Sequence, residues 1–130
     1  MSENISSVSR IPILVTLNNS IKMEGELIRH LSPLTIKKVL NHLPTSQLIN
    51  NFQKKFIQLK LELDIGLEKP QCKFKKGDIA FSSISNCIYI FLTDYTHSQK
   101  QFSHIGFIKT QNLDELIKTK AGDTLAIQKI

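Results

Sequence analysis

The most strongly patterned stretch of the chain is a pair of apolar segments in its second half. Residues 79–81 (Ile-Ala-Phe) follow a Gly-Asp turn, and a reversal rich in serine and asparagine separates them from the run Cys-Ile-Tyr-Ile-Phe-Leu at 87–92. β-branched and aromatic residues of this kind favour strands. Because the second segment is apolar at every position, both of its faces should be covered. We therefore expect this hairpin at the centre of a closed or covered sheet.

Alternation of apolar and polar positions predicts further strands. Residues 11–17 and 21–28 form a hairpin around Asn18 and Asn19, which tolerate a positive φ. Over 57–63 the odd positions are isoleucine or leucine and the even positions are polar, which is typical of a half-buried strand. Shorter strands are expected at 72–74, 104–108 and 125–130, whereas the polar stretches 45–51 and 95–101 are interpreted as loops.

The period changes to that of a helix after residue 32. Ser32 is suited to the N-cap and Pro33 to the first helical position, and an apolar stripe follows before Pro44: Ile36, Val39, Leu40 and Leu43. A second short helix is predicted after Asn112, which is suited to its N-cap. The fold class is therefore mainly β, a closed β-barrel capped by two short helices, with a flexible tail at 1–10 and one domain at 11–130.

The positive charge adds little to this picture. The formal charge is +6, and Arg10 and Arg29 are the only arginines among 17 basic residues, so we interpret the lysines mainly as a solvated surface. Lysines and aromatic residues interleave at 52–56 and 73–76, which would suit single-stranded nucleic acid. An alternating half-buried strand produces the same pattern, so nucleic acid is the least favoured partner.

Candidate chemistry is sparse. The chain has no phosphate-binding glycine loop and no hydrolase or metalloprotease motif, and its four histidines share no spacing, so no catalytic residues, metal or cofactor are predicted. Cys72 and Cys87 are compatible with a disulfide or with two separate thiols. Nothing at the start of the sequence resembles a signal peptide or a membrane span, so we expect a cytoplasmic protein without a membrane partner.

Three motifs resemble those of cyclophilins. The segment Leu-Ser-Pro-Leu-Thr-Ile at 31–36 is similar to the opening of their first helix, after the first hairpin. The segments 77–82 and 87–91 resemble the strand pair that carries part of their proline-binding pocket, and 104–108 resembles a later strand. The chain is most similar to the compact prokaryotic cyclophilin-like proteins, over residues 11–130. The resemblance implies a cyclophilin-like β-barrel.

The resemblance also implies a ligand site. Cyclophilins are peptidyl-prolyl cis-trans isomerases that use an arginine and a glutamine beside an apolar pocket. Where the resemblance places the arginine, this chain reads Phe-Ile-Gln-Leu at 56–59, and a neutral glutamine cannot replace a charged donor. We expect a protein that binds a proline-containing peptide or small ligand, with little or no isomerase activity; an active isomerase is the alternative, and a basic nucleic-acid-binding barrel the second alternative. The implied groove residues are Phe56, Gln58, Phe81, Tyr89 and Phe102.

Overall fold

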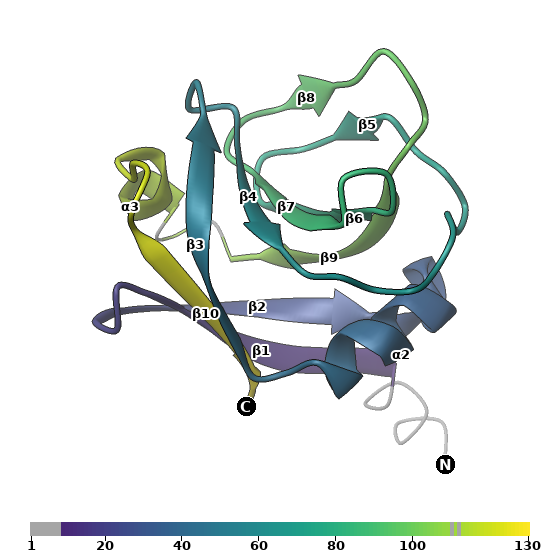
Figure 1. Cartoon of the computed structure of the whole chain (residues 1–130), viewed down its shortest axis with the longest axis horizontal. Coiled ribbons are helices and arrows are strands. Elements are labelled where there is room, and N and C mark those ends of the chain that lie inside the picture. Colours follow the sequence, from purple (N-terminus) through teal and green to yellow (C-terminus); the bar gives the residue numbers. More distant parts are fainter. Residues whose placement is uncertain (1–8, 110, 112) are drawn as a thin grey trace.

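The computed structural model describes residues 9–109, 111 and 113–130. Eight strands form its barrel: β1 (Arg10–Leu17), β2 (Ile21–Ile28), β3 (Thr45–Phe52), β4 (Phe56–Lys60), β6 (Asp78–Ser82), β7 (Cys87–Phe91), β9 (Ser103–Ile108) and β10 (Thr124–Lys129). They close in the order β1, β10, β3, β4, β7, β6, β9, β2, and each neighbouring pair is antiparallel (Figure 1). The predicted closed β-barrel is therefore confirmed. Closure leaves no free strand edge in the barrel.

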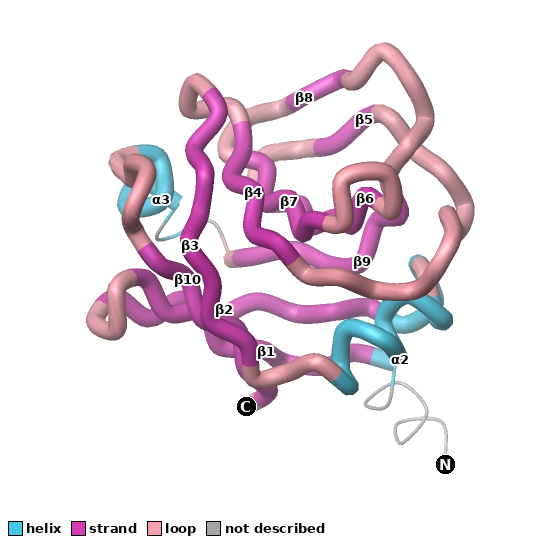
Figure 2. The backbone as a smooth tube through the Cα atoms, viewed as in Figure 1, coloured by secondary structure: helices cyan, strands magenta, loops and turns pink. Residues whose placement is uncertain are grey.

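Two short strands stand apart from the barrel. β5 (Lys73–Phe74) and β8 (Tyr95–Thr96) pair with each other as a two-stranded sheet, which lies over the outside of β4, β7 and β6 (Figure 2). We refer to residues 71–76 and 93–101 together as the flap. The first of these strands lies within the strand expected at 72–74, whereas the second lies in a stretch interpreted as a loop. A strand of two residues is too short to show a period.

The prediction of a loop at 45–51 is wrong, because this stretch lies in β3. The strand pairs with β10 on one side and with β4 on the other. Ile49 is its one fully buried residue, so the hydrophobic pattern that identifies most strands is absent. Backbone hydrogen bonds along both edges hold β3 in place, and such bonds do not require any particular pattern of side chains in the sequence.

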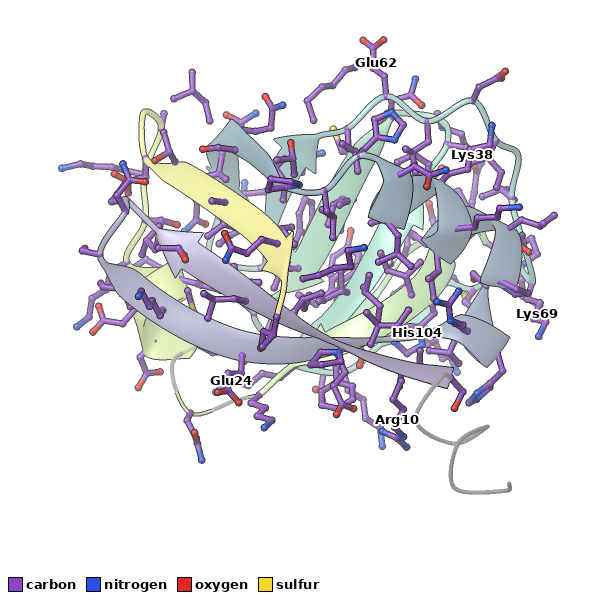
Figure 3. The ribbon with its side chains drawn as sticks, turned by 90° about the horizontal axis from the view of Figure 1, so that it is seen from below. Arg10, Glu24, Lys38, Glu62, Lys69 and His104 are labelled. Carbon is purple, nitrogen blue, oxygen red and sulfur yellow. The ribbon has the colours of Figure 1, made fainter. Side chains whose placement is uncertain are left out.

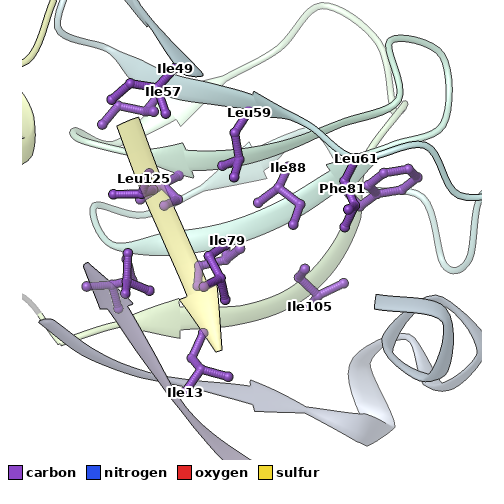
Figure 4. Close-up of a cluster of buried hydrophobic side chains, with 14 of the residues drawn as sticks. Ile13, Ile49, Ile57, Leu59, Leu61, Ile79, Phe81, Ile88, Ile105 and Leu125 are labelled. Atoms are coloured by element: carbon purple, nitrogen blue, oxygen red, sulfur yellow. The ribbon is translucent and has the colours of Figure 1, made fainter. Parts of the chain in front are cut away.

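The interior of the barrel is filled by aliphatic side chains from alternate positions of the strands. Ile57 and Leu59 of β4, and Ile88 and Ile90 of β7, are at most 1% exposed. Figure 4 shows several of these side chains converging inside the barrel, with Phe81 among them. Because strand residues alternate between faces, the neighbours of these positions must point outward. The outward set forms the candidate site described below.

The helix α2 (Pro33–Asn41) lies at the end of the barrel from which β3 starts (Figure 1). It follows a single 3₁₀ turn, η1 (Arg29–Leu31), and it buries Ile36 and Val39 as predicted, whereas Leu40 is half-buried. Ser32 makes no side-chain cap; its hydroxyl donates instead to the His104 carbonyl at 2.8 Å. The first turn is capped from a distant part of the chain.

The distant cap is Glu68. Its carboxylate accepts hydrogen bonds from the backbone N–H groups of Leu34 and Thr35 and from the Thr35 hydroxyl. Its own N–H donates to the Ser103 hydroxyl at 2.9 Å, which ties the segment to β9. Burial alone would raise the pKa of Glu68, but the hydrogen bonds from Thr35 and Leu34 outweigh it and lower the pKa below the ordinary value of 4.5.

The helix α3 (Leu113–Ile117) lies at the opposite end of the barrel (Figure 1). Asn112, its expected N-cap, lies outside the described residues. Its other end is held by Asn51 of β3, whose amide donates to the carbonyls of Ile117 at 3.1 Å and Thr119 at 3.0 Å. The two helices thus cap the two ends of the barrel, as the sequence predicted.

The closure between β2 and β9 depends on two glycines. A Cβ at Gly25 would lie 2.6 Å from the Phe107 carbonyl oxygen, and one at Gly106 would overlap the Glu26 carbonyl. Neither position therefore has room for a side chain.

Most of the predicted tail, residues 1–8, lies outside the described residues, but Arg10 already belongs to β1. Its guanidinium binds the Glu26 carboxylate at 2.9 Å on the outer surface, where Figure 3 shows Arg10 beside the first strands.

Candidate functional site

A second hydrophobic cluster lies outside the barrel, between its wall and the flap. Its buried members are Phe56, Phe74, Ala80, Tyr89, Phe91 and Phe102, and it is separate from the cluster that fills the interior. The wall contributes the outward residues of three neighbouring strands, β4, β7 and β6. The flap contributes Phe74, and Phe102 comes from the segment that leads into β9. We call this set the aromatic cluster.

The rings of the aromatic cluster pack around Phe91. Phe74 stacks on Phe91 with 4.5 Å between ring centroids and 6° between planes. Phe102 meets Phe91 edge-on at 5.9 Å, and Tyr89 meets Phe102 edge-on at 4.8 Å. Stacked and edge-to-face pairs of this kind add stabilisation beyond the burial of their area. The flap therefore covers the wall with the ring of Phe74, and also with that of Tyr95, which stacks on Phe91 at 5.5 Å.

One edge of the aromatic cluster is polar. The Gln58 side-chain N–H donates to the Tyr89 hydroxyl at 2.7 Å, and the Ser85 hydroxyl lies 3.3 Å from the same oxygen. On the flap, the Tyr95 hydroxyl lies 3.3 Å from Nδ1 of His97. Gln58, Ser85 and Tyr95 are half-buried, so this edge is in contact with solvent while the rings behind it are not. It offers an amide and hydroxyl groups beside an apolar surface.

The structure brings together four of the five predicted groove residues. Phe56, Gln58, Tyr89 and Phe102 belong to the aromatic cluster or its polar edge. Phe81 does not; it points into the barrel and is 1% exposed. The reason is the period of β6, in which Ala80 faces outward and its neighbours Ile79 and Phe81 face inward. The expectation for Phe81 is corrected accordingly.

Sequence reasoning missed three of the aromatic side chains in and around the aromatic cluster. Phe91 is its centre, Phe74 covers it, and Tyr95 packs against it from the flap. A signal for Phe91 was available, because residues 87, 89 and 91 must share one face of a strand. No comparable signal existed for Phe74 or Tyr95, since their position depends on how the flap folds back. Most of the cluster is closed to solvent: Phe56, Tyr89 and Phe102 are 7%, 6% and 1% exposed.

The remaining candidate chemistry is limited. Cys72 and Cys87 are free thiols, which decides between the two states that the sequence allowed. Nε2 of His104 lies 3.0 Å from the Gly106 carbonyl oxygen and 3.5 Å from the Asp78 carboxylate, so this histidine has local partners. Among the described residues no group of three acidic, histidine or cysteine side chains could hold a metal ion. No helix in the described part of the chain is long and apolar enough to cross a membrane.

The fold and site define a closed antiparallel β-barrel that carries an aromatic cluster on its outer wall under a two-stranded flap. No protein-family model and no curated protein matches the chain. The chain is similar in structure to a hypothetical protein from Archaeoglobus fulgidus, solved in solution, with a TM-score of 0.75 and 17% sequence identity. The match covers 94% of this chain and 96% of the other. At this identity the likeness shows the fold alone.

Proposed function

We propose that the protein is a compact cyclophilin-like protein that binds a peptide or another small ligand on the aromatic cluster. The observation that carries the proposal is the pairing of Gln58 with Tyr89 at the solvent edge of a cluster that the barrel does not need for its interior. Ligand sites commonly combine an apolar, aromatic surface with a few polar groups that fix orientation. Here the amide of Gln58 and the hydroxyls of Tyr89 and Ser85 are those groups.

The chemistry of the cluster favours a flat apolar ring. Phe91 and Phe102 meet Phe74 with one face and one edge, and these are the surfaces that a proline or aromatic ring of a ligand would contact. A peptide carbonyl placed at the edge would accept from the Gln58 amide, which now donates to Tyr89. On binding, the ring of the ligand therefore replaces that of Phe74 against Phe91 and Phe102, and its carbonyl replaces the Tyr89 hydroxyl as acceptor for Gln58.

Access requires the flap to lift, because the rings below it are buried. β5 and β8 are joined through two residue pairs, Lys73 with Thr96 and Phe74 with Tyr95. Backbone bonds attach the flap to itself and to the start of β9, including Gln71 N–H to the Phe102 carbonyl at 2.9 Å. Segments with few buried side chains and a short ladder open at lower free energy than barrel strands do.

The experiment is a titration of the isotope-labelled protein with the peptide Ala-Ala-Pro-Phe, followed by NMR. We expect shifts at the Gln58 side-chain amide and along the flap, and we expect Tyr89→Ala to abolish them. Phe107→Ala is the matched control, because Phe107 is a half-buried aromatic residue of β9 outside the aromatic cluster. Shifts that survive Tyr89→Ala, or that appear only on strands away from the flap, would contradict the proposal.

Isomerase activity is the second candidate function. Isomerisation of an Xaa-Pro bond has an uncatalysed barrier of about 18–20 kcal/mol, and a charged donor that acts on the rotating amide lowers it more than a neutral one does. Since Gln58 stands where the resemblance to cyclophilins calls for arginine, we expect slight acceleration of isomerisation of the same peptide, and a higher rate for Gln58→Arg. A native protein that isomerises the peptide efficiently, and whose rate does not depend on Gln58, would make the enzyme the better description.

A further inference from the structure

The structure brings two turns, both rich in lysine, to the same end of the barrel. Lys55 precedes β4, and its carbonyl accepts from the Leu92 N–H at 2.9 Å. Gly77 precedes β6, and its N–H donates to the Phe91 carbonyl at 2.7 Å. Because Phe91 and Leu92 are successive residues at the end of β7, the two turns flank that end from either side, as the order of the strands in Figure 1 shows. No local pattern in the sequence indicates that these turns meet.

The lysines of these turns carry charge that is not neutralised by ion pairs. Lys54, Lys55, Lys75 and Lys76 are exposed, and none of them makes an ion pair with another described residue. Two carboxylates lie close by, but they bind backbone: Asp78 accepts from the Lys75 N–H at 2.9 Å, and Asp94 accepts from the Lys76 N–H at 3.0 Å. These bonds fix the second turn while its ammonium groups stay in solvent. We call the four lysines the lysine rim.

An exposed aromatic ring stands at the lysine rim. Phe52, the last residue of β3, is 47% exposed, and it stacks on Phe56 with 5.0 Å between centroids and 12° between planes. The turn between them is tight, with positive φ angles of 51° at Gln53 and 61° at Lys54. Packing on one side holds the ring in place, so its exposed part is a fixed surface on which another flat ring can stack.

A depression of about 340 Å³ adjoins the same turn. It is lined by Asn51, Gln53, Lys54, Thr119, Lys120 and Ala121. Lys120 therefore adds a fifth cationic side chain next to the lysine rim, and the Gln53 side chain adds an amide. The surface around Phe52 thus offers cations, a stacking ring and a shallow hollow at one end of the molecule.

We propose that this surface binds single-stranded nucleic acid with little sequence selectivity. An unpaired base can stack on Phe52, whereas the bases of a duplex are already stacked on one another. Lysine ammonium groups attract phosphates as point charges and lack the planar fork with which arginine reads guanine. Binding at this surface does not require the flap to lift, because Phe52 and the lysine rim, including Lys75 and Lys76 of the flap itself, are exposed while the flap is closed.

The test is fluorescence anisotropy of a labelled oligothymidylate of about twelve nucleotides, titrated with the protein from about 50 to about 200 mM salt. The rim variant replaces Lys54, Lys55, Lys75 and Lys76 with glutamine. The control variant replaces four other exposed lysines, Lys37, Lys60, Lys100 and Lys129, and so has the same net charge. We expect the rim variant to bind at least about tenfold more weakly at the lowest salt. The plot of the logarithm of the binding constant against that of the salt concentration should also be shallower for this variant, by about 2.8 in slope. Each phosphate that a lysine neutralises on a single strand contributes about 0.7 to that slope.

The control variant should lose much less affinity. Equal losses in the two variants would show attraction by net charge alone and would overturn the proposal, as would an absence of binding by the native protein at the lowest salt. Phe52→Ala tests stacking, with Leu48→Ala as its match, since Leu48 is 66% exposed on the same strand. We expect Phe52→Ala to weaken binding about tenfold and Leu48→Ala to leave it unchanged. If Phe52→Ala has no effect and inorganic polyphosphate or duplex DNA binds as tightly, the surface is a general polyanion site and the proposal is wrong.

Discussion

Individual side chains make contacts in this protein that their own neighbourhood in the sequence does not predict. Ser32 has the residue type and the position of an N-cap, yet the side chain that caps the helix is that of Glu68, which lies 33 residues from Thr35 in the sequence. A carboxylate at a helix N-terminus satisfies free N–H groups and interacts favourably with the helix dipole. Once Glu68 occupies that place, the Ser32 hydroxyl is available to bind β9. The cap thus joins the segment after β4 to the helix.

Replacing Glu68 with glutamine should destabilise the protein by about 1 kcal/mol at pH 7, the usual value of a cap. The pKa of Glu68 is lower in the folded than in the unfolded protein, so the ionised carboxylate stabilises the fold at pH values above the ordinary pKa of 4.5. This contribution to stability is lost as the pH falls through the lowered pKa. Urea midpoints of the two proteins should therefore differ at neutral pH and converge in acid. Glu62→Gln is the control, since Glu62 is exposed and points into solvent in Figure 3. A difference that persists in acid would mean that shape and not charge matters at this position.

The elements differ in how far their sequences specify them. The β6–β7 hairpin was predicted because both faces of β7 are apolar, and each face is indeed buried, one by the barrel interior and the other by the aromatic cluster. The same uniform character made Phe81 ambiguous, since Ile79, Ala80 and Phe81 give no period from which to choose a face. β3 was missed for the opposite reason, because its side chains are mostly polar. Pairing with β10 and β4, which no local pattern encodes, decides its structure.

The flap should behave as a separate unit in amide hydrogen exchange. Its backbone hydrogen bonds lie in or beside two-residue strands, as His97 N–H to the Cys72 carbonyl at 2.7 Å does, whereas those of β7 lie between two barrel strands. We expect flap amides to exchange at least about a hundredfold faster than β7 amides, which corresponds to an opening free energy lower by about 2.8 kcal/mol. Equal protection would show that the flap opens only when the barrel unfolds. A ligand could not then reach the aromatic cluster in the native state.

At the scale of the whole molecule, the order of elements was enough to predict a closed barrel with a helix at each end. What it could not predict is the position of each strand around the barrel. β10 lies between β1 and β3, and the flap crosses the outer wall instead of joining it. That arrangement places Glu68 at the start of α2, Phe74 over Phe91, and Lys75 beside the end of β7. The fold could therefore be predicted from local patterns, while most of the candidate site depends on contacts between distant segments.

The position of β10 has a consequence for synthesis of the chain. β1 and β3 have no direct pairing, and β10 bridges them through registers such as Val15 with Ile127 and Ser46 with Ala126. Until residues 124–129 have left the ribosome, the other strands can form an open sheet whose two edges expose unpaired backbone groups. Contacts between segments so far apart in the chain also form slowly. During translation the barrel therefore cannot close until residues 124–129 have been released.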